Sequence, residues 1–159
     1  MNVGATNITD YGTYVNYGFL EKDTYPPAHS VYSGSENPLD LSRDLAHVSW
    51  GGSWHIPTKS QLDELVANTQ VEFINNYMET GINVGIFRKD GKELIIPAGG
   101  YFDATYGSNP QVFGTAGFIW SSTPVSNKAY YLATRNTTPY YYIDYSQRTV
   151  EYNIRPVIG

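Results

Sequence analysis

The sequence predicts an α+β domain in which two short helices pack on an antiparallel sheet. Two segments in the first half of the chain carry apolar residues at helical spacing, and several short segments in the second half are rich in tyrosine and β-branched residues. Aromatic residues make up 15% of the 159 residues and charged residues only 16%. This composition is typical of a folded, loop-rich chain with a substantial core.

The first helix is expected near residues 40–49. Leu41, Leu45 and Val48 recur there at helical spacing, and a Gly-Gly pair ends the pattern. The residues that could cap this helix are Asp40 and Ser42.

The second helix is expected near residues 59–68. Thr58 is a typical N-cap, and Gln61 stands three residues later, where it can complete a capping box. An apolar stripe follows, formed by Leu62, Leu65 and Val66. The stripe predicts that one side of this helix packs on the sheet.

The remaining elements are expected to be strands and loops. VGIFRKDGKELIIPA, which begins at residue 84, predicts a hairpin with Asp90-Gly91 at its turn. The Gly-rich stretch 99–117 is a long loop of a kind that often carries function. The antiparallel sheet is expected to include strands around 117–122, 129–135, 140–146 and 150–157.

One domain spanning residues 1–159 is expected, because no internal repeat or linker interrupts the chain. The opening segment, MNVGATNITDYGTY, has neither the basic nor the apolar region of a signal peptide. It is typical of the interior of a domain, which favours a chain whose leader has been removed.

Charge and hydropathy argue against two kinds of partner. The formal net charge of −5 provides no basic footprint for nucleic acid or for an anionic lipid surface. No run of residues is apolar enough to span a bilayer. We therefore expect no nucleic-acid partner and no membrane insertion by this domain.

No residue pattern predicts catalysis or metal binding. The chain has no cysteine, and His29, His47 and His55 lack the spacing of a helical zinc site. Asp40 and Asp44 stand four residues apart, as solvated acids near a helix N-terminus often do. We expect no catalytic residue, no metal and no cofactor, and a protein that is not an enzyme.

Ordered sequence blocks over nearly the whole chain resemble a bacterial domain family. The family was first named as the major paralogous domain of Fibrobacter and is common in gut Bacteroidetes. The blocks are NVGAT…YGTYVNYG (from residue 2), DLAHVSWGGSWHIPTKSQLDELV (44–66), LIIPAGGY (94–101), GFIWSST (117–123), AYYL (129–132) and IRPV (154–157). The resemblance implies a C-type-lectin-like fold, with two helices flanking a small twisted antiparallel sheet and long loops.

The resemblance also implies roles for individual residues. Trp54 is expected to pack between helix and sheet, with Pro57 starting the helix that follows. Trp120 is expected in the core, where Ser121 and Ser122 would satisfy backbone groups instead of acting as catalysts. The calcium motifs of the sugar-binding lectins are missing, and so are the cysteines of the formylglycine-generating enzymes. Calcium-dependent sugar binding and that oxidative chemistry are therefore not expected.

Some relatives of this fold are variable proteins of diversity-generating retroelements, found in phage or on bacterial surfaces. Their diversified positions lie near the C-terminus, after the WSS block and before RPV. The tyrosine-rich stretch AYYLATRNTTPYYYIDYS (129–146) occupies the same place here. The predicted location is accordingly extracellular, on a bacterial cell surface or on a phage particle.

Alternation along the strands predicts which of these side chains face outward. Leu132 should face the core with Tyr130 and Thr134, and Ile143 should do so with Tyr141 and Tyr145. Tyr145 joins the outward set if a bulge or early turn reorients it, and Tyr152 joins from the last strand. The predicted ligand-binding residues are Tyr131, Ala133, Arg135, Tyr140, Tyr142, Asp144, Tyr145, Ser146 and Tyr152.

A surface of tyrosine, serine, asparagine and threonine provides rigid contact area at low entropic cost. The sequence therefore predicts a recognition module for a protein or cell-surface ligand. The alternative is a structural or interaction subunit of a bacterial surface assembly, in which the tyrosines cover a sheet or meet a neighbouring subunit.

Overall fold

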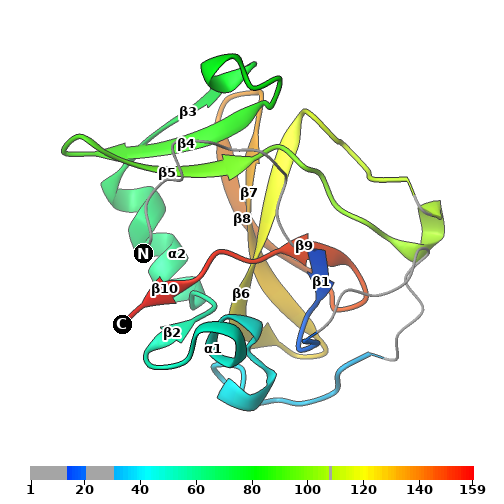
Figure 1. The fold of residues 1–159 in the computed structure, drawn as a ribbon. Coiled ribbons are helices and arrows are strands. Elements are labelled where there is room, and N and C mark those ends of the chain that lie inside the picture. The colour runs from blue at the N-terminus through cyan, green and yellow to red at the C-terminus, as the bar shows by residue number, and fades with distance from the viewer. Residues whose placement is uncertain (1–13, 21–30, 108) are drawn as a thin grey trace.

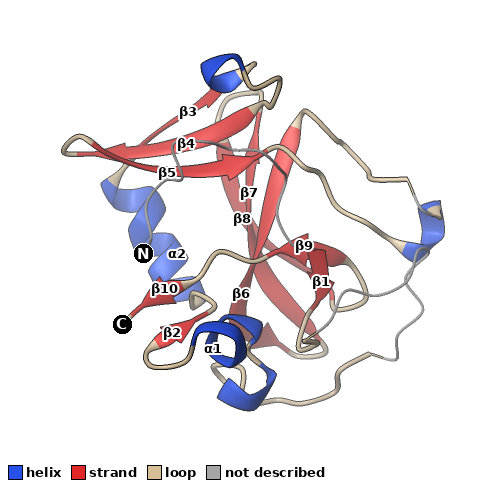
Figure 2. Cartoon of the chain, in the orientation of Figure 1, coloured by secondary structure: helices blue, strands red, loops and turns tan. Residues whose placement is uncertain are grey.

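The computed structural model describes residues 14–20, 31–107 and 109–159, and these residues form a mostly β protein (Figures 1 and 2). The two α-helices of the described residues are α1 (Leu45–Trp50) and α2 (Lys59–Asn68). The strands are β1 (Tyr14–Asn16), β2 (Trp54–His55), β3 (Gln70–Ile74), β4 (Val84–Lys89), β5 (Lys92–Pro97), β6 (Ala116–Val125), β7 (Lys128–Arg135), β8 (Tyr141–Gln147), β9 (Glu151–Asn153) and β10 (Val157–Ile158). Short 3-10 turns lie at Leu41–Arg43, Tyr77–Glu79 and Ala104–Tyr106.

The central sheet has five strands in the order β1-β9-β6-β7-β8. Strands β6, β7 and β8 form an antiparallel meander, and β1 pairs antiparallel with β9. Strand β9 lies parallel to β6, with Asn153 opposite Ile119. The sheet is therefore mixed.

A second layer covers one face of the central sheet (Figure 1). It consists of α2 and the antiparallel sheet β3-β4-β5. Leu62 of α2 and Phe87 of β4 pack there against Ile119 and Leu132. The layers approach most closely at Gly85, where an added Cβ would lie 1.8 Å from Thr134 Oγ1, so this position admits only glycine.

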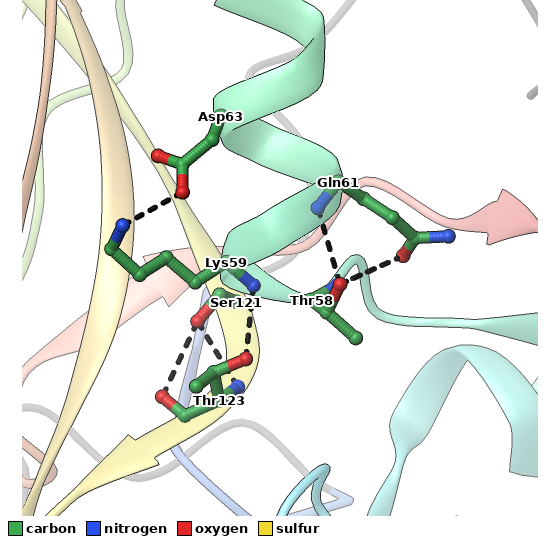
Figure 3. Close-up of polar contacts among 6 residues, drawn as sticks. All are labelled: Thr58, Lys59, Gln61, Asp63, Ser121 and Thr123. Atoms are coloured by element: carbon green, nitrogen blue, oxygen red, sulfur yellow. Dashed lines mark hydrogen bonds and ion pairs between the residues drawn. The ribbon is translucent and has the colours of Figure 1, made fainter.

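The start of α2 forms as the sequence predicts. Thr58 Oγ1 accepts a hydrogen bond from Gln61 N (3.2 Å), and Gln61 Oε1 accepts one from Thr58 N (3.0 Å), which together make the capping box. Figure 3 shows that this helix end is also bonded to β6, because Lys59 N donates to Thr123 Oγ1 (2.9 Å). Ser121 Oγ accepts from Thr123 N (3.1 Å), so this serine satisfies the backbone as expected.

The predicted fold class, an α+β C-type-lectin-like arrangement with two helices flanking an antiparallel sheet, is wrong. The described residues contain more strand (41%) than helix (19%), they form three sheets, and the five-stranded sheet is mixed. The expected strand 150–157 is two strands in different sheets, since β10 pairs with β2 while β9 joins the central sheet. Alternation of residues reveals that a strand exists, but it does not reveal the partner of that strand.

The first helix is shorter than predicted, and its stripe was assigned wrongly. Leu41 and Val48 are exposed, whereas Ala46 is buried. The reason is Asp44, whose buried carboxylate accepts from His47 N (3.0 Å) as the N-cap and from Ile56 N (2.8 Å) after β2. These two hydrogen bonds from backbone N–H groups to one carboxylate fix the orientation of α1.

The two tryptophans expected in the core have different environments. Trp120 is buried with 1% of its surface exposed, as predicted. Trp54 is only half-buried, and its ring packs edge-on against exposed Trp50 at 4.8 Å instead of between helix and sheet. The expectation for His29 and for the first part of the NVGAT block concerns residues outside the described ranges.

Candidate functional site: a tyrosine-lined groove

A groove of about 630 Å³ opens on the other face of the central sheet, between β7, β8 and the loop before β6. We call it the tyrosine groove. Its floor consists of Phe118, Tyr131 and Tyr152, and its rim includes Tyr101, Asp103, Arg135, Thr137, Tyr142 and Ser146.

The floor of the groove is part of the hydrophobic core. Phe118 and Tyr152 are stacked with ring centroids 5.2 Å apart, and Tyr131 lies 4.8 Å from Tyr152. The Trp120 ring packs against Tyr152, with ring centroids 4.5 Å apart. Because these rings are packed on several sides, the floor is rigid before any ligand arrives.

The rim of the groove is polar and more accessible. Tyr142 lies opposite Ala133 in the β7–β8 ladder, and its ring meets Tyr131 edge-on at 6.0 Å. The Arg135 guanidinium lies 5.0 Å from the centre of the Tyr142 ring, and its Nε donates to Pro139 O (2.8 Å). Across the groove, Asp103 accepts from Thr105 N (2.9 Å) at the start of a 3-10 turn. The groove therefore combines aromatic surface with one fixed cation and one fixed anion.

The phenol groups of the floor stay neutral at physiological pH. Burial raises the pKa of Tyr131 well above the usual tyrosine value, and the neighbouring hydroxyls of Tyr152 and Tyr142 raise it further. Burial also raises the pKa of Tyr152, although hydrogen bonds with Ser146 and Tyr131 offset part of that effect. The floor of the groove therefore carries polar hydroxyls but no negative charge.

Stability should fall in alkaline solution. Burial raises the pKa of Tyr17, Tyr131 and Tyr152. Their contribution is therefore fully present below the pKa of an unfolded tyrosine, about 10, and is lost as pH rises further. Thermal unfolding followed by circular dichroism should show a melting temperature that declines steeply only above about pH 10.

Ultraviolet absorbance of tyrosinate provides the check on this prediction. Some of the fifteen tyrosines should ionise only as the fold is lost. Ionisation of all of them together, with the fold intact, would contradict the expected burial effect.

The structure brings five of the nine predicted site residues together at the groove. They are Tyr131, Arg135, Tyr142, Ser146 and Tyr152. Ala133 is buried, and Tyr140, Asp144 and Tyr145 do not line the groove.

The prediction that Tyr131 and Ala133 point into solvent is wrong. Tyr131 is 8% exposed and Ala133 is fully buried, while Leu132 and Thr134 on the opposite face are buried too. Strand β7 is central and covered on both faces, so alternation of residues along it does not distinguish a solvent-exposed face from a buried one. Tyr152 is likewise buried in the floor.

Tyr145 lies on the opposite face of the sheet from the groove. It is 47% exposed, and its ring packs edge-on against Tyr130 at 5.8 Å. Lys128 Nζ lies 5.5 Å from the ring centre. No bulge reorients it, because it pairs in register with Tyr130.

Sequence reasoning missed the residues on the other wall of the groove. Tyr101 and Asp103 come from the Gly-rich loop 99–117, which was expected to be functional but was not connected to the tyrosine-rich segment. The bridge between Tyr101 and Gln111 closes this loop over the sheet. The only sequence signal was the length of the loop.

Two further expectations concern metals and membranes. Over residues 14–20, 31–107 and 109–159, no three histidine, aspartate or glutamate side chains are grouped so that they could hold a metal ion. Within the same ranges, no helix has the length and apolar character needed to cross a bilayer.

Comparison with known proteins adds no relative to this description. No protein-family model matches the chain, and no curated protein or solved structure shows significant similarity to it.

Proposed function

We propose that this protein is a non-enzymatic recognition module that binds a protein or other cell-surface ligand in the tyrosine groove. The observation that supports this best is the convergence of separate segments. Residues of β7, β8 and β9 and of the loop before β6 line one hollow, with a packed aromatic floor and a polar rim. Concave sites with aromatic walls and a few placed polar groups are typical ligand sites.

The chemistry of the rim suits recognition by contact. Tyrosine presents a large amphipathic surface while losing little side-chain entropy, and serine and threonine supply adaptable hydrogen bonds. Arg135 and Asp103 provide charges of opposite sign that can orient a polar ligand. Because the aromatic side chains of the floor are already packed in place, binding costs less side-chain entropy.

The proposed location is extracellular, on a bacterial surface or on a phage particle. It rests on the resemblance of the ordered sequence blocks to the Fibrobacter domain family. Diversification by a retroelement belongs to the same proposal, and the geometry limits where it could act. Tyr142 and Ser146 on the rim could vary at little cost, whereas Tyr131 and Tyr152 belong to the core.

The test is binding of labelled protein to intact gut Bacteroidetes cells, measured by flow cytometry. Truncation of an aromatic hot-spot residue costs about 2 kcal/mol or more, so Tyr142→Ala should weaken binding about thirtyfold if the ligand contacts this ring. Its fold should persist, because Tyr142 is only half-buried.

Tyr145→Ala is the matched control for this experiment. It removes an accessible tyrosine from the same strand but outside the groove, so binding should be unchanged. Equal binding by Tyr142→Ala and the unchanged protein would refute the proposal. Unfolding of Tyr142→Ala would show instead that the ring is structural.

A structural or interaction subunit of a surface assembly is the second candidate. Its support is a set of exposed apolar side chains near α1 and β10, with Trp50 at 53% and Ile158 at 51% exposure. Large exposed apolar residues often mark protein interfaces. Light scattering after size exclusion separates the two: a stable oligomer favours this candidate, and a monomer favours recognition in the groove.

A further inference from the structure

A second, smaller pocket lies on the opposite face of the central sheet from the tyrosine groove. It has a volume of about 160 Å³ and lies between α2, β10 and the centre of β6. Figure 1 shows β10 beside the start of α2. Its walls are mainly aliphatic, with Leu62 and Leu65 from α2, Leu94 from β5 and Ile119 from β6.

One charged side chain lines this apolar pocket. Arg155 lies between β9 and β10. Its Nε is buried without a hydrogen-bond partner, and no carboxylate of the described residues forms an ion pair with it. Burial lowers the pKa of this guanidinium. A buried guanidinium nitrogen without an acceptor is costly, so its presence calls for an explanation.

Arg148, the other arginine of the C-terminal region, has a guanidinium whose nitrogen atoms all have hydrogen-bond acceptors. Arg148 is more deeply buried, yet its nitrogen atoms donate to four backbone carbonyls. Its charge is also placed over the ring of Tyr17 at 4.8 Å. Arg155 has no comparable set of acceptors among the described residues.

Gln61, the other polar side chain that lines the pocket, already has partners. Gln61 Oε1 accepts from Thr58 N, and Gln61 Nε2 donates to Gly159 O (3.3 Å). His55 Nε2 lies 3.0 Å from the same Gly159 oxygen. Arg155 is thus the group at this pocket that remains available to an added anion.

We propose that this pocket binds a carboxylate carried on a short apolar group, with Arg155 pairing with the carboxylate and the aliphatic walls holding the apolar group. A guanidinium presents paired N–H donors that match a carboxylate. A cavity of about 150 Å³ holds a molecule the size of benzene, so the apolar group is a branched aliphatic chain or a single ring.

The carboxylate could come from a free acid or from the C-terminus of a peptide. Ile158 at the pocket lies opposite Trp54 in the β2–β10 ladder. Trp54 in turn packs on exposed Trp50. A peptide whose last side chain fills the pocket would therefore have these tryptophan rings beside its preceding residues.

The first experiment compares isovalerate with isovaleramide by calorimetry on the unchanged protein. The two molecules have nearly the same shape, but only isovalerate carries a charge. Isovalerate should bind with a Kd of about 1 mM, and the amide should bind at least about tenfold more weakly. Equal binding of both, or binding of neither, would overturn the proposal.

The second experiment uses Arg155→Met, which keeps side-chain length and removes the charge. Isovalerate binding should fall at least about tenfold, while the melting temperature stays the same or rises, because an unpartnered charge is removed. Arg155→Lys keeps the charge but loses the paired donors, so it should bind isovalerate with intermediate affinity. If Arg155→Met does not fold, Arg155→Lys serves as the test variant in its place. Unchanged isovalerate binding by Arg155→Met, or by Arg155→Lys in that case, would refute the assignment.

A third comparison distinguishes the two sources of the carboxylate. The probe is a short peptide that ends in leucine, with a free or an amidated C-terminus. Tighter binding of the free form than of isovalerate, weakened by Trp50→Ala, indicates a peptide C-terminus. Binding of isovalerate without binding of the peptide indicates a free acid.

Discussion

Replacing Trp120 by alanine is expected to lower the free energy of unfolding by about 3–5 kcal/mol, because a large buried ring leaves a cavity that collapses poorly. The ring contacts Tyr152 at 4.5 Å and Tyr17 at 5.6 Å. Its Nε1 donates to Val15 O (2.7 Å), which bonds β6 to the β1 segment. The substitution removes the ring and leaves that carbonyl without its donor. Urea unfolding followed by circular dichroism measures the loss.

Trp54→Ala is the internal comparison for this prediction. Trp54 is half-buried and packs on an exposed ring, so its loss should cost only about 1 kcal/mol, the usual size for a substitution outside the core. The sequence alone predicted equal burial for the two residues. Equal losses of stability would show that Trp54 contributes more to the core than its contacts indicate.

Replacing Arg148 by methionine is expected to cost on the order of 4 kcal/mol, because several buried carbonyls lose a charged donor at once. Nη1 donates to Tyr32 O and to Gly34 O, both at 2.7 Å. Nη2 and Nε donate to Ser126 O and Lys128 O, each at 3.2 Å. One side chain therefore joins the segment around Tyr32 to the β6–β7 turn.

Two further substitutions sharpen the Arg148 prediction. Arg148→Lys keeps the charge but cannot reach all four carbonyls, so its loss of stability should be smaller than that of Arg148→Met. Arg155→Met removes the same kind of group from a position with no acceptors, and its stability should not fall. A melting temperature of Arg148→Met equal to that of the unchanged protein would show that the carbonyls find other donors.

Local signals in the sequence predict local structure well. The second helix has its predicted bounds because Thr58 and Gln61 fix its start through bonds within four residues. The β4–β5 hairpin likewise follows from its Asp90-Gly91 turn. In both cases the residues that determine the element are its own neighbours.

Long-range structure could not be predicted in the same way. The parallel pairing of β9 with β6 has no sequence signature, and it changes the fold class. The burial of Tyr131 depends on Phe118 and Tyr152, which belong to other strands of the sheet. The sequence carries no signal for the burial of Arg148, because an isolated arginine in a polar stretch is usually exposed. The side of the tyrosine groove formed by β7 and β8 could therefore be predicted, whereas the wall formed by Tyr101 and Asp103 could not.

Strand β9 has a consequence for how the protein is made. It pairs with β1, from the start of the described chain, on one side and with β6 on the other, so the central sheet stays incomplete until β9 has left the ribosome. Until then, the face of β6 and β7 that carries Phe118 and Trp120 lacks Tyr152 as a cover. Folds with such distant pairings form slowly, and their nascent chains expose apolar strands. This domain should complete its folding only after β9 has been synthesised, and its nascent chain is one that chaperones would be expected to protect.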